Sequence, residues 1–206
     1  MSPVWTLGLA VLGRTTALNS APAPGMCKEL KVQDDFNLTT YISKKWYAQW
    51  QNEQWDLTMD ELKCVTAEYT LLAEDMWEKY LGWSISIRNK ADPTQNDTEG
   101  HHCARQVNGA KWLMGPCYIS PILGGKYWVV SYDEARGYAL VAGGQPNKPT
   151  SNGKCLYHEE GIRGLWILTR EQFPPWSLIQ NVKQVALDMG LDTKRMFKVE
   201  QQGCPS

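Results

Sequence analysis

The sequence predicts an all-β fold, an eight-stranded antiparallel up-and-down barrel followed by one C-terminal α-helix. Short segments rich in aromatic and β-branched residues recur along the chain, separated by turn residues. The links between them are short, which favours antiparallel neighbours. A helical period of apolar residues follows the last long strand. Eight antiparallel strands lose their exposed edges most completely by closing into a barrel.

The predicted strands have the length and alternation typical of β-structure. Trp83, Ile85 and Ile87, for example, share one face of a strictly alternating segment. Asn108-Gly109 lies between two strands and favours a tight hairpin turn. The strands are expected at residues 46–50, 64–72, 83–88, 103–107, 111–118, 127–132, 138–142 and 165–170.

A helix is expected after Pro174-Pro175, because the spacing of the apolar residues changes there. Proline is common in the first helical turn, and Gly190 lies where a helix commonly ends. A short strand over residues 196–199 is expected after the helix. The apolar residues that form one face of the helix are Leu178, Val182, Val185, Ala186 and Met189.

Composition excludes some classes of function. Lys and Arg total 21 against 22 Asp and Glu, a net charge of −1, which argues against a large face for nucleic acid or an acidic membrane. The chain has ten Trp but only three Phe. Much aromatic surface must therefore be buried or must line a binding site, since each large ring hides about 150–250 Å² when buried.

The six cysteines are an even number, and none forms a C-x-x-C pair. A zinc ribbon or a thioredoxin-type site is therefore disfavoured, and three disulfides formed in an oxidising compartment are expected. Six cysteines allow fifteen sets of pairs, and their number alone does not choose among them.

The N-terminus is typical of an exported protein. Residues 4–13 are a run of ten apolar or small residues, too short to span a bilayer and suited to the core of a signal peptide. We therefore expect a leader at residues 1–26 and the folded domain at residues 27–206. No other stretch is apolar and long enough to predict a transmembrane span.

Three motifs resemble those of the lipocalin family. Lys44-Lys45-Trp46-Tyr47 resembles G-x-W-Y, residues 127–141 resemble the second motif around T-D-Y, and the segment ending at Arg170 resembles the third. The motifs occur in order, a helix follows the third, and the resemblance covers residues 27–205. Lys44 replaces the glycine of the first motif, and the second motif has one extra residue before Tyr138.

Two branches of the family compete. Residues 27–36 and 63–69 resemble the apolipoprotein D and bilin-binding branch, which includes the plastid lipocalins. This resemblance implies the disulfides Cys64–Cys204 and Cys27–Cys155. Cys103 and Cys117 remain, on adjacent strands of a predicted hairpin where geometry permits a disulfide. Residues 52–56 and 161–164 instead resemble the lipocalin core of violaxanthin de-epoxidase, an enzyme that reduces epoxy-carotenoids in the thylakoid lumen.

The resemblance assigns roles to aromatic residues. Arg170 is expected to stack on Trp46 at the closed end of the barrel, which is a structural role. Tyr69 and Trp166 are expected to point inward by strand parity and by resemblance. The alternative is that the rings simply fill the barrel. The candidate ligand-binding residues are Tyr69, Trp83, Trp112, Trp128, Tyr138 and Trp166.

The expected function is non-catalytic binding or transport of a small hydrophobic molecule, such as a carotenoid, bilin, sterol or fatty acid, in the barrel. No cofactor is required, although a pigment or lipid could be bound as cargo. One alternative is a violaxanthin de-epoxidase-like enzyme with Asp56 as the acid. Another is a structural subunit of a larger, for example photosynthetic, assembly. Nucleic acid is not an expected partner.

The remaining candidates concern metals, glycans and location. His101 and His102 are adjacent and His158 is distant, so we expect solvated histidines and no metal site. Asn37 and Asn96 begin glycosylation sequons. Secretion is the expected destination, because no long Ser-rich transit region precedes the fold. The thylakoid lumen is the alternative.

Overall fold

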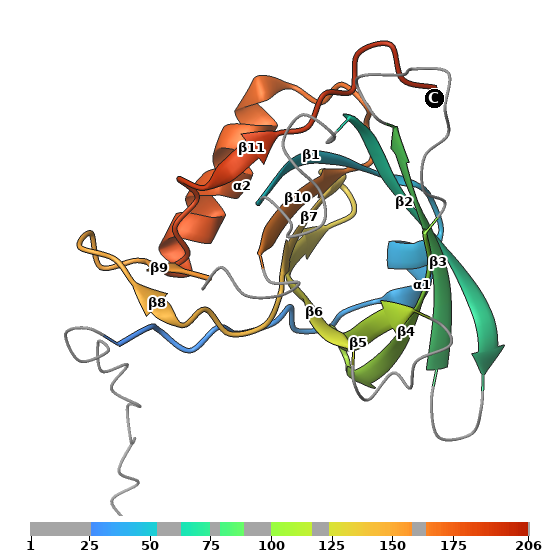
Figure 1. Cartoon of the computed structure of the whole chain (residues 1–206), viewed down its shortest axis with the longest axis horizontal. Helices are drawn as coiled ribbons and strands as arrows, with labels where there is room; N and C mark the ends of the chain where they lie inside the picture. Colours follow the sequence, from blue (N-terminus) through green and yellow to red (C-terminus); the bar gives the residue numbers. More distant parts are fainter. Residues whose placement is uncertain are drawn as a thin grey trace, which may run out of the picture.

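Eight antiparallel strands close into a barrel in the computed structural model of the chain (Figure 1). The structure describes residues 26–52, 63–74, 79–88, 100–116, 124–157 and 164–205, with the backbone only for 72–74, 79–88, 100, 101 and 116. The barrel strands are β1 (Trp46–Asn52), β2 (Lys63–Glu74), β3 (Lys79–Arg88), β4 (Gly100–Asn108), β5 (Lys111–Pro116), β6 (Gly125–Asp133), β7 (Tyr138–Ala142) and β10 (Leu165–Thr169).

Consecutive strands pair from β1 to β7, and β10 then pairs with both β7 and β1. This last pairing closes the sheet, so the predicted eight-stranded up-and-down order is confirmed. A ninth strand, β11 (Met196–Lys198), pairs with the end of β1 at Trp50–Asn52, beyond the part of β1 that pairs with β2. The C-terminal segment therefore completes the wall at the end of the barrel where β1 and β2 separate.

Helix α2 (Trp176–Asp188) packs against the outside of the barrel, as Figure 1 shows. Its buried residues are Ile179, Val182 and Ala186. The predicted apolar face is thus rotated slightly, because Val185 is only partly buried and Ile179 is buried instead. The helix begins after Pro175, as expected from the two prolines.

Two elements were not predicted from the sequence. Helix α1 (Leu38–Ile42) has five residues, and Asn37 caps it by accepting a hydrogen bond from the backbone N–H of Thr40 at 3.1 Å. The other is the pair β8 (Lys148–Pro149) and β9 (Cys155–Leu156). Neither element is long enough to produce a recognisable period of apolar residues.

Buried side chains form two clusters on opposite faces of the barrel wall. The inner cluster fills part of the barrel and includes Trp46, Tyr69 and Trp112. The outer cluster lies between the barrel and α2 and includes Leu140 and Ile167. The alternation of side chains along a strand separates the two clusters, and the inner one positions the candidate site.

Two disulfides hold the terminal segments, the N-terminal one to β9 and the C-terminal one to β2 of the barrel. Cys27 is bonded to Cys155 and Cys64 to Cys204, which are the pairs that the resemblance implies. Cys103 is also disulfide-bonded. Cys117 lies outside the described residues, so the pair Cys103–Cys117 stays a prediction. Neither described helix is long and apolar enough to cross a membrane.

Candidate functional site: the aromatic interior of the barrel

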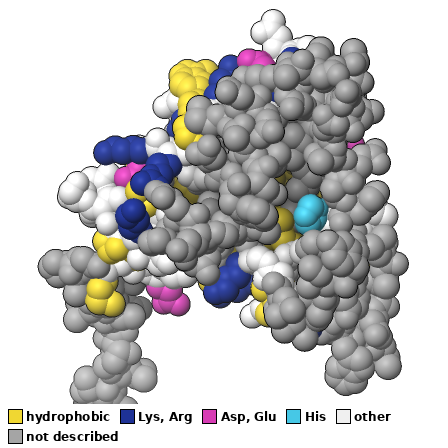
Figure 2. Space-filling view, viewed as in Figure 1, with side chains coloured by type: hydrophobic (Ala, Val, Ile, Leu, Met, Phe, Trp, Pro, Cys, Tyr) yellow, Lys and Arg dark blue, Asp and Glu magenta, His cyan; other side chains and the backbone are white. Residues whose placement is uncertain are grey.

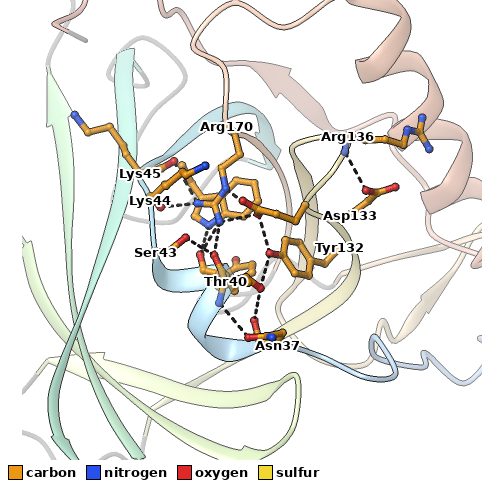
Figure 3. Close-up of polar contacts among 12 residues, drawn as sticks. Asn37, Thr40, Ser43, Lys44, Lys45, Tyr132, Asp133, Arg136 and Arg170 are labelled. Carbon is orange, nitrogen blue, oxygen red and sulfur yellow. Dashed lines mark hydrogen bonds and ion pairs between the residues drawn. The ribbon is translucent and has the colours of Figure 1, made fainter.

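Arg170 closes one end of the barrel by stacking on Trp46. Figure 3 shows its guanidinium beside Thr40 and Lys44, to whose carbonyl oxygens it donates hydrogen bonds. The guanidinium carbon lies 3.6 Å from the centroid of the Trp46 ring, and this ring is fully buried. The predicted contact between the first and third motifs is therefore present. Trp46 also donates a hydrogen bond from its indole Nε1 to the carbonyl oxygen of Tyr41 at 2.9 Å.

The same guanidinium ties three parts of the chain together. It donates hydrogen bonds to the carbonyl oxygens of Thr40 and Tyr41 in α1, at 2.7 and 3.1 Å, and to that of Lys44. It also forms an ion pair with Glu134, with 3.0 Å between Nη2 and Oε2. These contacts add charged donors to carbonyl groups near the C-terminal end of α1. They fit the structural role that is expected of Arg170.

Three tyrosine hydroxyls meet inside the barrel. Hydrogen bonds of 2.8 Å join the Tyr127 hydroxyl to the hydroxyls of Tyr41 and Tyr69. Burial raises the pKa of Tyr69 to about 12, and it raises the pKa values of Tyr41 and Tyr127 well above their usual range. All three hydroxyls therefore stay neutral at physiological pH. They form a polar centre in a largely apolar interior.

Two tryptophan rings and the ring of Tyr127 form a column across the interior. The rings of Trp112 and Tyr127 are stacked, with centroids 5.3 Å apart and planes 12° apart. Tyr127 and Trp166 continue the column, with centroids 6.5 Å apart and planes 26° apart. Trp112 is buried, whereas Trp166 is only partly buried against the inner cluster. The column thus ends on a ring that is not fully covered.

The structure brings three of the six candidate ligand-binding residues into the inner cluster, namely Tyr69, Trp112 and Trp166. Trp83 is a fourth candidate, and its backbone pairs with that of Tyr69 in the register of β2 and β3. The Trp83 side chain lies outside the described residues. Its role therefore stays a prediction.

Trp128 and Tyr138 belong to the outer cluster, so their expected inward orientation is wrong. Trp128 follows Tyr127, and Tyr138 precedes Ala139, both of which face the interior. Because neighbouring residues of a strand point to opposite faces, Trp128 and Tyr138 must point outward. The ammonium of Lys111 lies 4.6 Å from the centroid of the Trp128 ring, which gives this ring a partner on the outside.

Gln51 is an interior residue that sequence reasoning missed. It pairs with Trp166 in the register between β1 and β10, and cross-strand partners lie on the same face of a sheet. Its side chain is 3% exposed. The carbonyl oxygen Oε1 of its amide has no hydrogen-bond partner within the described part of the chain.

The other sequence candidates lie elsewhere. His102 is half-buried in β4. Among the described residues, no group of three or more His, Cys, Asp or Glu side chains could hold a metal ion. Asn37 is exposed at the start of α1. Asp56, Asn96, His158 and the side chain of His101 lie outside the described residues.

Known proteins resemble the chain over most of its length, although no protein-family model matches it. Apolipoprotein D of Mus musculus is 25% identical over 195 residues, 93% of this chain and 90% of its own. Apolipoprotein D of Macaca fascicularis is 27% identical over 184 residues, 88% of this chain and 85% of its own.

Solved structures show the same fold. Lobster apocrustacyanin A1 is 15% identical with a TM-score of 0.55, covering 88% of this chain and 92% of its own. Apocrustacyanin C2 is 15% identical with a TM-score of 0.51, covering 82% of each chain. The closed eight-stranded barrel with its external helix, the contact between Arg170 and Trp46, and the similarity to apolipoprotein D together support the resemblance of this chain to lipocalins.

Proposed function

We propose that the chain binds and transports a small hydrophobic molecule with a flat ring system or polyene, held inside the barrel. The column of rings that ends on the partly buried Trp166 is the observation that supports this proposal most strongly. A flat ligand placed against Trp166 would extend the column and cover its last ring. Among the expected ligand classes, carotenoids and bilins have such a flat conjugated system.

The position of the ligand follows from the side chains that fill the closed end of the barrel. Arg170, Trp46 and Tyr41 occupy the closed end, where both rings are fully buried. Trp166 lies three residues along β10 from Thr169, the strand residue next to Arg170. We therefore place the ligand beyond Trp166, on the side away from Arg170.

The relatives support this class of ligand. The word apolipoprotein denotes the protein component of a lipoprotein, and apolipoprotein D matches nearly the whole chain.

The charge of the chain also agrees with an apolar ligand. In the face shown in Figure 2, the described Lys and Arg side chains are interspersed with acidic and apolar ones, and the net charge is −1. The described side chains of this face therefore do not form the concentrated positive patch that captures polyanions.

A structural subunit with a filled barrel is the second candidate. The dense packing of Tyr41, Trp46 and Trp112, each at most 1% exposed, favours it, because these rings fill the closed half of the barrel. The enzyme alternative depends on Asp56 and predicts turnover of an epoxy-carotenoid with a reductant. Asp56→Asn would abolish that turnover but would leave ligand binding intact.

We propose that the mature domain spans residues 27–206 and is secreted after removal of the leader. The disulfides Cys27–Cys155 and Cys64–Cys204 support export, since disulfides form and persist in oxidising compartments such as the secretory pathway. The relatives reported above are animal proteins, and they do not support a location in the thylakoid lumen.

Native mass spectrometry of protein purified from its own source tests the carrier function. A carrier is expected to retain a small hydrophobic molecule, with visible absorption if that molecule is a carotenoid or a bilin. The mass of the released ligand would identify it. Protein that is free of small molecules, and that also fails to bind any polyene saturably, would favour the filled-barrel subunit instead.

A further inference from the structure

Gln51 lies beside the place where we put the ligand. It pairs with Trp166 on one side and with Phe197 of β11 on the other. Both pairings place its side chain on the same face of the sheet as these two aromatic residues. Directly opposed residues of antiparallel strands have Cβ atoms about 4.5–5.5 Å apart, so the Gln51 amide reaches the same space as the Trp166 ring.

The two neighbouring buried glutamines use their amides to hold the protein together. Gln49 donates to the carbonyl oxygens of Glu171 and Gln172, at 3.3 and 3.1 Å. Gln201 donates to those of Ala48 and Val65, at 2.8 and 3.0 Å, and so bridges β1 and β2, although its own Oε1 has no partner within the described ranges. The Gln51 amide makes no such bridge, and its Oε1 lacks a partner within the same ranges although the side chain is 97% buried.

A buried carbonyl oxygen without a partner opposes folding, because it loses its hydrogen bonds to water and gains none in return. An apolar residue of similar size would avoid this loss at the same position. A buried polar group that destabilises the empty protein in this way, and that lies in a binding site, is expected to form a hydrogen bond with the ligand.

We infer that Gln51 anchors the polar end of the ligand, by accepting a hydrogen bond at Oε1 from a ligand hydroxyl or N–H group. This inference rests on the proposed carrier function and narrows its ligand class. A carbonyl oxygen accepts hydrogen bonds and cannot donate them. The preferred ligand is therefore a flat hydrophobic molecule that carries a donor at one end, with its flat part against Trp166. An ether or ester of the same shape lacks that donor.

A matched pair of probes tests the inference, namely all-trans-retinol and its methyl ether. Both are flat polyenes of nearly equal size, and only retinol carries a donor. Each is titrated into the full mature protein, and quenching of tryptophan emission gives its Kd. We expect retinol to bind about tenfold more tightly than the ether, which corresponds to about 1.4 kcal/mol.

Gln51→Met is expected to remove this preference. Retinol should bind about tenfold more weakly, and the affinity for the ether should stay unchanged or rise. Gln49→Met is the matched control, since it makes the same replacement two positions away and should keep the tenfold ratio. The melting temperature of Gln51→Met should equal or exceed that of the wild type, because the change removes an unpaired polar atom.

The outcomes separate this inference from the carrier function. Equal Kd values for the two probes in the wild type, or an unchanged ratio in Gln51→Met, would overturn the anchor and leave the carrier function standing. Saturable binding of neither probe would count against the carrier function itself. A ratio lost in Gln49→Met as well would show that the preference does not arise at Gln51.

Discussion

The guanidinium carbon of Arg170 lies 3.6 Å from the centroid of the Trp46 ring, and the same group donates hydrogen bonds to the carbonyl oxygens of Thr40 and Tyr41. One side chain thus joins the last barrel strand to the first and to α1. These contacts all lie at the closed end of the barrel, away from Trp166. Stability and ligand affinity are therefore expected to respond differently to changes at Arg170.

Arg170→Ala should destabilise the fold by about 2 kcal/mol or more, since it removes the cation–π contact with Trp46, the ion pair with Glu134 and the hydrogen bonds to carbonyl groups of α1. Chemical denaturation with urea measures this loss. Arg136→Ala is the control, because Arg136 is exposed and its guanidinium carbon lies 5.2 Å from the Tyr138 ring centroid. We expect the control to change stability by less than about 0.5 kcal/mol. Equal stability of the Arg170 variant and the wild type would refute the structural role.

The tyrosine network predicts a loss of stability at alkaline pH. Burial raises the pKa of Tyr69 to about 12, and it raises those of Tyr41 and Tyr127 well above the value of about 10 in the unfolded chain. Raised pKa values contribute stability that is fully present below pH 10 and is lost as the pH rises through 12. The melting temperature should fall over this range, and absorbance at 295 nm should show late ionisation of these tyrosines. Complete ionisation near pH 10 in the folded protein would contradict the buried network.

The third disulfide can be tested by peptide mapping without reduction. We expect Cys27–Cys155, Cys64–Cys204 and also Cys103–Cys117. Replacing Cys64 and Cys204 together by Ser should lower the free energy of unfolding by about 2–5 kcal/mol, because this bridge ties the C-terminal segment to the barrel. A peptide that links Cys103 to any other cysteine would show the third assignment to be wrong.

Asn37 is expected to carry an N-linked glycan when the chain is expressed through a secretory pathway. It is exposed, and its Oδ1 caps α1 while the amide nitrogen is the atom that a glycan modifies. Removal of glycans by an amidase should lower the mass, and Thr39→Ala should remove the component attached at Asn37. A mass that the amidase leaves unchanged, and that Thr39→Ala lowers only by the difference between the two side chains, would exclude this site. The Asn96 sequon is tested in the same way with Thr98→Ala.

The sequence was sufficient to predict the fold because the signals for it are local and repeated. Alternation defines the strands, Pro174-Pro175 and Gly190 mark the limits of α2, and Trp46 with Arg170 accounts for part of the resemblance to lipocalins. The register of single strands was harder to predict. Aromatic character alone favours an inward orientation for Trp128 and Tyr138. Their neighbours Tyr127 and Ala139 occupy the inner face of the barrel instead.

Gln51 could not be predicted for a related reason. Strict alternation from Trp46 through Ala48 would place Trp50 inside the barrel and Gln51 outside. The register between β1 and β10 shifts between Ala48 and Trp50, so Trp50 faces the outer cluster and Gln51 faces the interior. Such a bulge moves every later side chain of the strand to the other face, and nothing in the local sequence marks its position.

The carrier function is tested most directly by titrating all-trans-retinol into the wild type, Trp166→Ala and Trp128→Ala. Trp166 ends the inner column of rings, whereas Trp128 lies in the outer cluster. Each variant removes one partly buried tryptophan, so Trp128→Ala controls for the general effect of losing an indole ring. Melting temperatures of both variants show that they remain folded.

We predict saturable quenching of tryptophan emission in the wild type. The Kd should rise about 5- to 150-fold in Trp166→Ala, the equivalent of about 1–3 kcal/mol for one lost aromatic contact. It should stay within about twofold of the wild type in Trp128→Ala. An absence of saturable quenching, or equal weakening in the two variants, would contradict a ligand held against Trp166 inside the barrel.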